Sequence, residues 1–125
     1  MSTIDLKNLT ITKAHTDLVA GTYTSVELAR AYLDVIAEKN KDLNAYLEVY
    51  ADVLEQAKVA DIKIAECKKA GAPVPALAGI PFAVKDNILI KGRVASAASK
   101  MLEGYSATYD ATVIEKLKKE GVVFL

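Results

Sequence analysis

Cysteine, tryptophan and proline are scarce in this chain of 125 residues, which has one cysteine, no tryptophan and three prolines. The single cysteine, Cys67, excludes an internal disulfide framework, and its place in a helix-forming run predicts a partly buried side chain rather than a reactive thiol. An excess of charge is also absent, because 16 basic residues balance 16 acidic ones. A neutral chain lacks the attraction that a basic surface has for nucleic acid, so we expect no direct nucleic-acid binding.

Targeting signals and long apolar runs are missing as well. The N-terminus MSTIDLKNLT has no basic segment followed by an apolar one, so no secretory signal is visible. No apolar run reaches the roughly 18 to 20 residues that span a bilayer. We therefore expect a cytoplasmic protein without a membrane partner. A hydrophobic fraction of 52% is ample for a core, and the length suits a single domain over residues 1–125.

Residues that commonly hold metals or cofactors are few and scattered. His15 is the only histidine, and we expect it at the surface or partly packed, because a metal site needs several converging ligands. There is no phosphate-binding glycine loop and no zinc-ligand spacing. Asp61 and Glu66 fall on helix faces expected to be solvated, so no catalytic pair of carboxylates is predicted. We expect neither a metal nor a cofactor.

Four segments have the apolar spacing of amphipathic helices, and each is followed by glycine or another helix-ending signal. The second begins with Thr24 and Glu27, whose three-residue spacing is that of a capping box, and is expected to break at residues 40–42. Asp110 is expected to cap the fourth helix. The predicted helices cover residues 10–20, 24–39, 51–70 and 110–120.

Apolar extended segments alternate with these helices. Residues 44–50 (NAYLEVY) predict a short strand with Tyr46 and Tyr50 on one face. Residues 77–90 predict one or two buried strands that meet at a Lys-Asp-Asn interruption, and residues 122–125 predict the start of another. The alternation favours an α/β fold with helices packed on a partial mixed sheet. Because the sequence ends within an apolar strand, we expect a partial domain.

Lys85 is the residue that most suggests chemistry, because it interrupts the apolar stretch GIPFAVKDNILI. A lysine enclosed by apolar strands loses its charge more readily than one in water, and a neutral amine can take a proton from a hydroxyl group. The pattern also fits a lysine that ends a strand and either reaches solvent or pairs with Asp86. The spacing alone leaves both interpretations open.

The stretch LAGIPFAVKDNI resembles the segment around the catalytic lysine of the amidase-signature family. The likeness covers essentially the whole chain, and its downstream part is most similar to the A subunits of aspartyl/glutamyl-tRNA amidotransferases. The chain is therefore expected to be the N-terminal portion of an amidase-signature fold. The segments that carry the resemblance are residues 21–28, 43–46, 77–88, 91–92, 98–102 and 109–113.

Members of this family hydrolyse amides with a Ser–cis-Ser–Lys triad, so the resemblance implies that Lys85 is the general base. The nucleophile and the bridging serine lie in a later Gly/Ser-rich segment of the family, and nothing in these 125 residues resembles it. Ser96 and Ser99 fall in a loop that the resemblance places near the active site, where Ser96 could at best hydrogen-bond Lys85. Because triad members act as a unit, we expect the chain to be inactive by itself.

Two functions are compatible with these observations. The first is a fragment of an amidotransferase, whose parent is implied to release ammonia from glutamine for mischarged Glu-tRNA(Gln) or Asp-tRNA(Asn) and to pair with tRNA-binding subunits. The second is a non-enzymatic module that associates with itself. Unpaired strand edges recruit other chains, so residues 80–84 and 122–125 predict a homo-oligomer.

Overall fold

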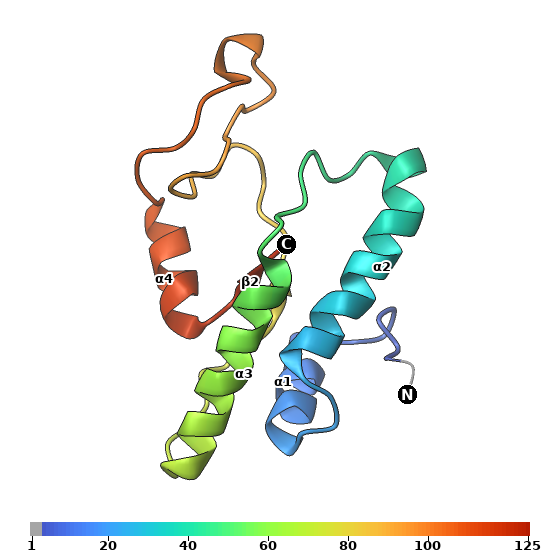
Figure 1. Cartoon of the computed structure of the whole chain (residues 1–125), viewed down its shortest axis with the longest axis vertical. Coiled ribbons are helices and arrows are strands. Elements are labelled where there is room, and N and C mark those ends of the chain that lie inside the picture. Colours follow the sequence, from blue (N-terminus) through green and yellow to red (C-terminus); the bar gives the residue numbers. More distant parts are fainter. Residues whose placement is uncertain (1–3) are drawn as a thin grey trace.

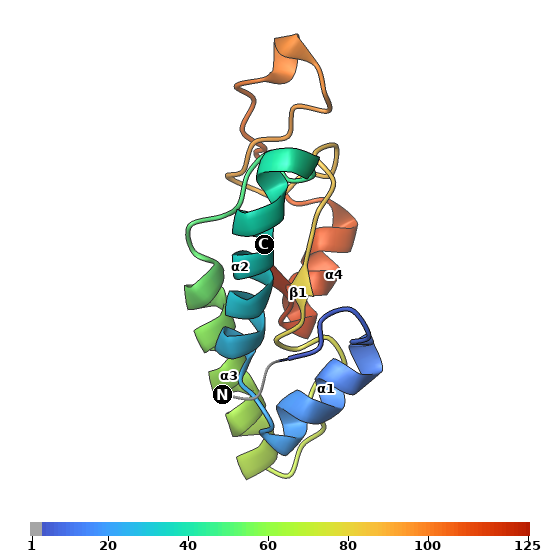
Figure 2. The ribbon, with the colours of Figure 1, turned by 90° about the vertical axis from the view of Figure 1, so that its right-hand side faces the viewer.

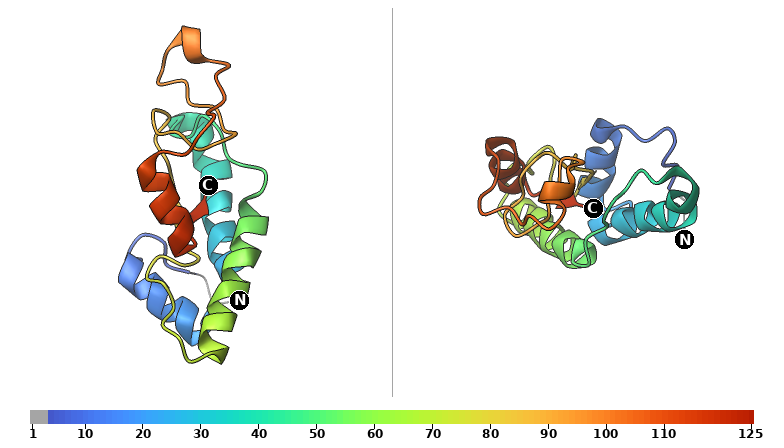
Figure 3. Two further views of the ribbon diagram at one scale, coloured as in Figure 1. Left: turned by 90° about the vertical axis from the view of Figure 1, so that its left-hand side faces the viewer. Right: turned by 90° about the horizontal axis from the view of Figure 1, so that it is seen from above.

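The computed structural model describes residues 4–125, in which four α-helices surround a two-stranded parallel sheet (Figure 1). Helices α2 and α3 lie side by side, and α4 lies on the opposite side of the sheet from α2 (Figures 1 and 3). The elements are α1 (Ile11–Ala20), α2 (Ser25–Leu43), α3 (Val53–Lys69), β1 (Pro81–Phe82), the 3-10 helix η1 (Lys100–Leu102), α4 (Thr112–Glu120) and β2 (Val123–Phe124).

The beginnings of α1 and α2 are capped as the sequence predicted. Thr10 accepts a hydrogen bond from the backbone of Lys13 at the start of α1. At α2, the Thr24 N–H donates to Glu27 Oε2 over 2.8 Å, and the Glu27 N–H donates to Thr24 Oγ1 over 3.1 Å. The bond from the Thr24 N–H, followed by one from the Thr24 hydroxyl to the same carboxylate, lowers the pKa of Glu27. A carboxylate is favourable here because a helix N-terminus carries partial positive charge.

Two predicted helix ends are wrong. Helix α2 does not break at residues 40–42 but continues to Leu43, and Asn44 ends it in the left-handed conformation with φ 48°. Asparagine tolerates that conformation better than most side chains, which explains the later end. At α4, Ala111 is the N-cap residue and no side chain caps the helix, so Asp110 does not have the predicted role.

Asp110 instead joins α4 to the loop before it. Its Oδ1 accepts a hydrogen bond from the Lys91 N–H over 2.7 Å, and its Oδ2 accepts one from Lys118 Nζ over 2.6 Å. The bond from Lys118, followed by the bond from Lys91, lowers the pKa of Asp110. The carboxylate is thus used for tertiary contacts rather than for the helix end.

The strand predicted for residues 44–50 does not form. The side chain of Asn40 bonds the backbone of Tyr46 instead: its Nδ2 donates to the Tyr46 carbonyl over 2.9 Å, and its Oδ1 accepts from the Tyr46 N–H over 2.8 Å. Tyr46 and Tyr50 therefore do not share a strand face, although both pack against the same apolar cluster. A side chain from the end of α2 supplies the bonds that a neighbouring strand would have made.

The apolar segment 77–90 contains one strand, which is shorter than predicted, and residues 122–125 contain the predicted second one. The two strands are parallel, with Pro81 opposite Val123 and Phe82 opposite Phe124. The expectation of helices packed on a partial sheet is confirmed. The sheet that residues 4–125 form is parallel rather than mixed.

The side chains of β2 divide the core, because successive residues of a strand point to opposite faces. Val123 and Leu125 pack with α2 and α3. Val122 and Phe124 pack on the other face with α4. A third cluster joins α1 to the start of β1 through Ile80. The small sheet therefore lies where three apolar clusters meet.

The N-terminus of α2 is also held from α3 by Asp61. The two oxygens of this carboxylate accept hydrogen bonds from the N–H groups of Ser25, over 2.7 Å, and Val26, over 3.2 Å. The prediction of a solvated face is therefore wrong for Asp61, whereas Glu66 is exposed as expected. The buried Ser25 Oγ donates to the Gly79 carbonyl over 2.8 Å. Gly79 has φ +76° and a Cβ there would lie 3.0 Å from the Ser25 side chain, so this close approach requires glycine.

We predict that Asp61→Ala lowers the free energy of unfolding by about 1–2 kcal/mol, the usual cost of losing a helix N-terminal cap. Glu66→Ala, on the exposed face of the same helix, is the matched control and should change that free energy by less than about 0.5 kcal/mol. Urea denaturation followed by circular dichroism measures both variants. Equal losses in the two variants would contradict the capping role of Asp61.

Candidate active site

Lys85 follows β1 and lies beyond the carboxyl end of that strand. The chain stays extended here, so Phe82 and Val84 pack into the cluster beside α4, whereas Ala83 and Lys85 are exposed. Of the two environments considered for Lys85, the structure shows the one in which the side chain reaches solvent. Open α/β sheets bind ligands beyond the carboxyl ends of their parallel strands, and Lys85 occupies such a position. Its role in proton transfer stays a prediction.

Asp86 holds the loop that carries both candidate serines. Its Oδ1 accepts a hydrogen bond from the Ser96 N–H over 3.1 Å, and its Oδ2 accepts one from the Ser96 hydroxyl. The Ser96 hydroxyl, which was considered as a partner of Lys85, is therefore bonded to Asp86. The bond from this hydroxyl, followed by the one from the Ser96 N–H, lowers the pKa of Asp86. Ser99 precedes η1 and makes no side-chain capping bond.

The same loop contains backbone strain. Ala97 and Ala98 have φ values of 48° and 59°, in the left-handed region that residues with a Cβ rarely adopt. Each such residue costs about 1–3 kcal/mol, and such residues persist where the surrounding structure holds them. Asp86 provides part of that hold, because its carbonyl accepts a hydrogen bond from the Ala97 N–H over 3.3 Å. Strained backbone of this kind is common at functional sites, which agrees with its place beside Lys85.

The chain beyond this loop forms an arm that projects from one end of the molecule, with η1 at its tip (Figure 2). Backbone hydrogen bonds cross the base of the arm, from the Ala95 N–H to the Tyr105 carbonyl over 3.1 Å and from the Ala107 N–H to the Arg93 carbonyl over 2.9 Å. Met101 in η1 is 95% exposed. The arm therefore carries η1 and an apolar side chain away from the three core clusters, whereas Ser96, near its base, is held by Asp86.

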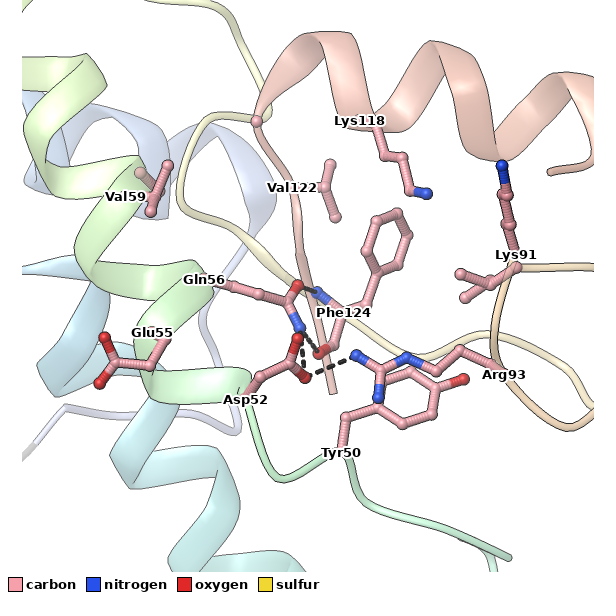
Figure 4. Close-up of a pocket in the computed structure, with 13 residues that line it drawn as sticks. Tyr50, Asp52, Glu55, Gln56, Val59, Lys91, Arg93, Lys118, Val122 and Phe124 are labelled. Carbon is pink, nitrogen blue, oxygen red and sulfur yellow. Dashed lines mark hydrogen bonds and ion pairs between the residues drawn. The ribbon is translucent and has the colours of Figure 1, made fainter. Parts of the chain in front are cut away.

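A cleft of about 510 Å³ lies between α3 and α4 beside β2 (Figure 4). The guanidinium group of Arg93 lies 2.6 Å from Asp52 Oδ1 and 4.1 Å from the centre of the Tyr50 ring. Burial raises the pKa of Asp52, but the hydrogen bond and the charge of Arg93 outweigh it, and the net shift is downward. Burial also raises the pKa of Tyr50, and the charge of Arg93 opposes that shift. This cluster closes one end of the cleft.

The residues of this cleft were missed by the sequence analysis. Arg93 and Asp52 are 41 positions apart, and neither belongs to a recognisable motif. The sequence gives only a local indication of the cleft, because the start of α3 brings together three polar residues: Tyr50, Asp52 and Gln56. That spacing places polar groups at one helix end but does not identify their partners.

The other residues considered from the sequence, His15 and Cys67, do not form a site with other reactive side chains among residues 4–125. Within residues 4–125, no three side chains of the metal-ligating types gather in one place. His15 is half-buried on α1, and its Nδ1 has no hydrogen-bond partner in that part of the chain. Cys67 is half-buried, as predicted. None of the helices described combines the length and the apolar character needed to cross a membrane.

We predict that acid releases the serine loop from Asp86. The pKa of Asp86 is lowered in the folded chain, so its contribution to loop order is complete above the ordinary aspartate range and is lost as the pH falls through the lowered folded value. The protection factor of the Ser96 N–H, which is its intrinsic exchange rate at each pH divided by the rate measured by NMR, should fall across that acidic window. In Asp86→Asn the acidic transition should disappear, and a transition unchanged by this substitution would assign it to another group.

Comparisons with known proteins agree with this geometry. The profile of the Amidase family matches residues 27–125. The A subunit of the glutamyl-tRNA(Gln) amidotransferase of Renibacterium salmoninarum is 45% identical over 101 residues, which cover 81% of this chain and 19% of that protein. The corresponding A subunit from Borrelia garinii is 38% identical over 122 residues, which cover 98% of this chain and 24% of that protein. The chain thus spans about a quarter of the length of these relatives.

Solved structures give the same assignment. The peptide amidase of Stenotrophomonas maltophilia superimposes with a TM-score of 0.83 at 29% sequence identity, covering 97% of this chain and 24% of that one. An amidase family protein from Bacillus anthracis superimposes with a TM-score of 0.81, also at 29% identity, covering 94% of this chain and 23% of that one. The two-stranded sheet with its four helices is therefore part of a larger known fold, and the chain belongs to the amidase family.

Proposed function

We propose that this chain forms the lysine-bearing part of an amide-hydrolysing active site, in which Lys85 is the general base. The position of Lys85 beyond the carboxyl end of β1 is the observation that carries the proposal. Asp86, the next residue, holds the loop that contains Ser96 and Ala97, so that loop is anchored one residue after Lys85. The nucleophile and the bridging serine would come from another part of the amidase fold, because no Gly/Ser-rich segment occurs in these 125 residues.

The exposure of Lys85 is consistent with a general base that another part of the amidase fold covers in the assembled site. Water stabilises the ammonium form of lysine, whereas an apolar cover stabilises the neutral amine that can accept a proton. In the assembled site the amine would take the proton of the bridging serine, and that serine would take the proton of the nucleophile. Without the cover and the serines, the chain should not hydrolyse amides.

We further propose glutamine as the amide of the assembled enzyme, because the named relatives are A subunits of glutamyl-tRNA(Gln) amidotransferases. The ammonia released would serve transamidation on mischarged tRNA held by partner subunits. The equal numbers of acidic and basic residues in this chain favour tRNA contacts on those partners rather than here. A peptide amide is the competing substrate class, since a peptide amidase shares the fold.

The alternative, a non-enzymatic module that associates through open strand edges, has less support. In β1, Pro81 has no N–H to offer to another strand. In β2, both backbone groups of Phe124 already bond to Gln56. Association of the isolated chain through β2 therefore requires the bonds between Gln56 and Phe124 to break. We therefore prefer the proposal that the chain forms part of an amide-hydrolysing site.

A chimera tests the role of Lys85. We expect that replacing the matching N-terminal part of the Renibacterium salmoninarum protein, 19% of its length, with this chain gives an enzyme that releases ammonia from glutamine in the presence of its natural partners. Lys85→Ala should lower that rate by about 10³-fold or more, since members of such triads act together. A coupled glutamate dehydrogenase assay measures the ammonia.

The matched control is Lys116→Ala, which removes an exposed lysine from α4 and should leave the rate within about twofold. An active chimera that is insensitive to Lys85→Ala would contradict the assignment of the base. Ammonia release by the isolated 125-residue chain would contradict the claim that the serines come from elsewhere. Glutamine and a peptide amide, compared in the same chimera, separate the two substrate classes.

A further inference from the structure

The outer edge of β2 is closed by a side chain. On the inner edge, the N–H of Val123 donates to the Ile80 carbonyl and the N–H of Leu125 donates to the Phe82 carbonyl, each over 3.0 Å. Backbone groups alternate in direction along a strand, so the N–H and carbonyl of Phe124 face away from β1. These are the groups to which a further strand would bond.

Gln56 of α3 occupies both of these groups (Figure 4). Its Oε1 accepts a hydrogen bond from the Phe124 N–H over 2.9 Å, and its Nε2 donates to the Phe124 carbonyl over 3.2 Å. A residue of an adjacent strand would make the same pair of bonds, one as acceptor and one as donor. The side-chain amide therefore supplies the same acceptor and donor that one residue of a third strand would supply.

The orientation of this amide is fixed by its neighbours. Gln56 Nε2 also donates to Asp52 Oδ1 over 3.2 Å, which places the NH₂ group on the side of the Phe124 carbonyl. Asp52 is in turn held by Arg93 over 2.6 Å, and Arg93 stacks on Tyr50. If the amide were flipped, its NH₂ group would face the Phe124 N–H, and its oxygen would face both Asp52 and the Phe124 carbonyl. The cluster at the end of the cleft thus holds Gln56 in its bonding orientation.

We propose that the Gln56 amide is a surrogate strand, which keeps the outer edge of β2 closed to extended segments from a second copy of this chain. Free strand edges are templates for pairing with other chains, and proteins commonly protect them. The cleft of about 510 Å³ between α3 and α4 borders Phe124, so an extended segment could reach this edge once the amide withdrew. The homo-oligomer predicted from the strand sequences would then form through β2 only after Gln56 is displaced. This inference is independent of the proposed amidase chemistry.

The principal test is Gln56→Met, which keeps the length of the side chain but removes both hydrogen bonds. Glu55→Met is the matched control, because it adds the same apolar side chain at an exposed position on α3 that makes no bond to β2. Sedimentation velocity over a concentration series measures association. We expect Gln56→Met to associate at a concentration at least about tenfold lower than wild type, whereas Glu55→Met follows wild type. Equal association of the two variants would overturn the proposal.

Hydrogen exchange measured by NMR keeps the proposal testable if Gln56→Met fails to fold. Gln56 is the only glutamine in the chain, so its side-chain NH₂ signals can be assigned by residue type. In the wild type, the Phe124 N–H should exchange at least about tenfold more slowly than an unprotected amide. Fast exchange there, beside a protected Val123 N–H, would overturn the proposal. In a folded, monomeric Gln56→Met, protection should be lost at Phe124 and kept at Val123.

Discussion

The parallel pairing of β1 with β2 is the contact on which the rest of the structure depends. Only two residues of each strand pair, yet Ile80, Val123 and Phe124 belong to three different apolar clusters. Hydrogen bonds of 3.0 Å at both ends of β2 fix the register. A shift by one residue would exchange the side chains that face α3 with those that face α4, so both clusters would lose their packing together. The pairing thus orients α1, α2, α3 and α4 about one centre and sets where the chain emerges at Lys85.

A sheet this small leaves backbone groups that must be satisfied by other means, because buried peptide groups without partners are costly. Two side-chain amides meet this need in the same way. Asn40 bonds the N–H and carbonyl of Tyr46, and Gln56 bonds those of Phe124. The two hydrogen bonds of Asn40 join residues only six positions apart, at the end of α2. The two hydrogen bonds of Gln56 span 68 positions and join α3 to the sheet. The same chemistry therefore serves a local loop in one place and the tertiary fold in the other.

Helices were predicted well from the sequence because their signals are local. The capping box at Thr24 and the glycine at position 121 each act within a few residues, and both have the expected role. Strands were predicted less well, since a strand needs a partner that the local pattern does not identify: residues 44–50 have suitable side chains but bond to Asn40 instead. Asp61 was assigned to solvent for the same reason, because its partners on α2 lie 35 and 36 positions away. The lysine segment was recognised by its resemblance to a family, but its exposure follows from the alternation after β1, which only the pairing with β2 determines.

The structure separates the position of the candidate base from its reactivity. The position of Lys85 is set within this chain, because the residue follows β1. The next residue, Asp86, anchors the strained loop that contains Ala97 and Ala98. Reactivity depends on the surroundings of the amine, because a lysine in water is stabilised as the ammonium ion and cannot accept a proton. Lys85 is exposed, so an apolar environment for its amine would have to come from outside residues 4–125. Under the proposal that Lys85 is the general base, the part of the fold that covers its amine would also have to bring the hydroxyl groups of the two serines, so a single surface would supply both the apolar environment and the nucleophile.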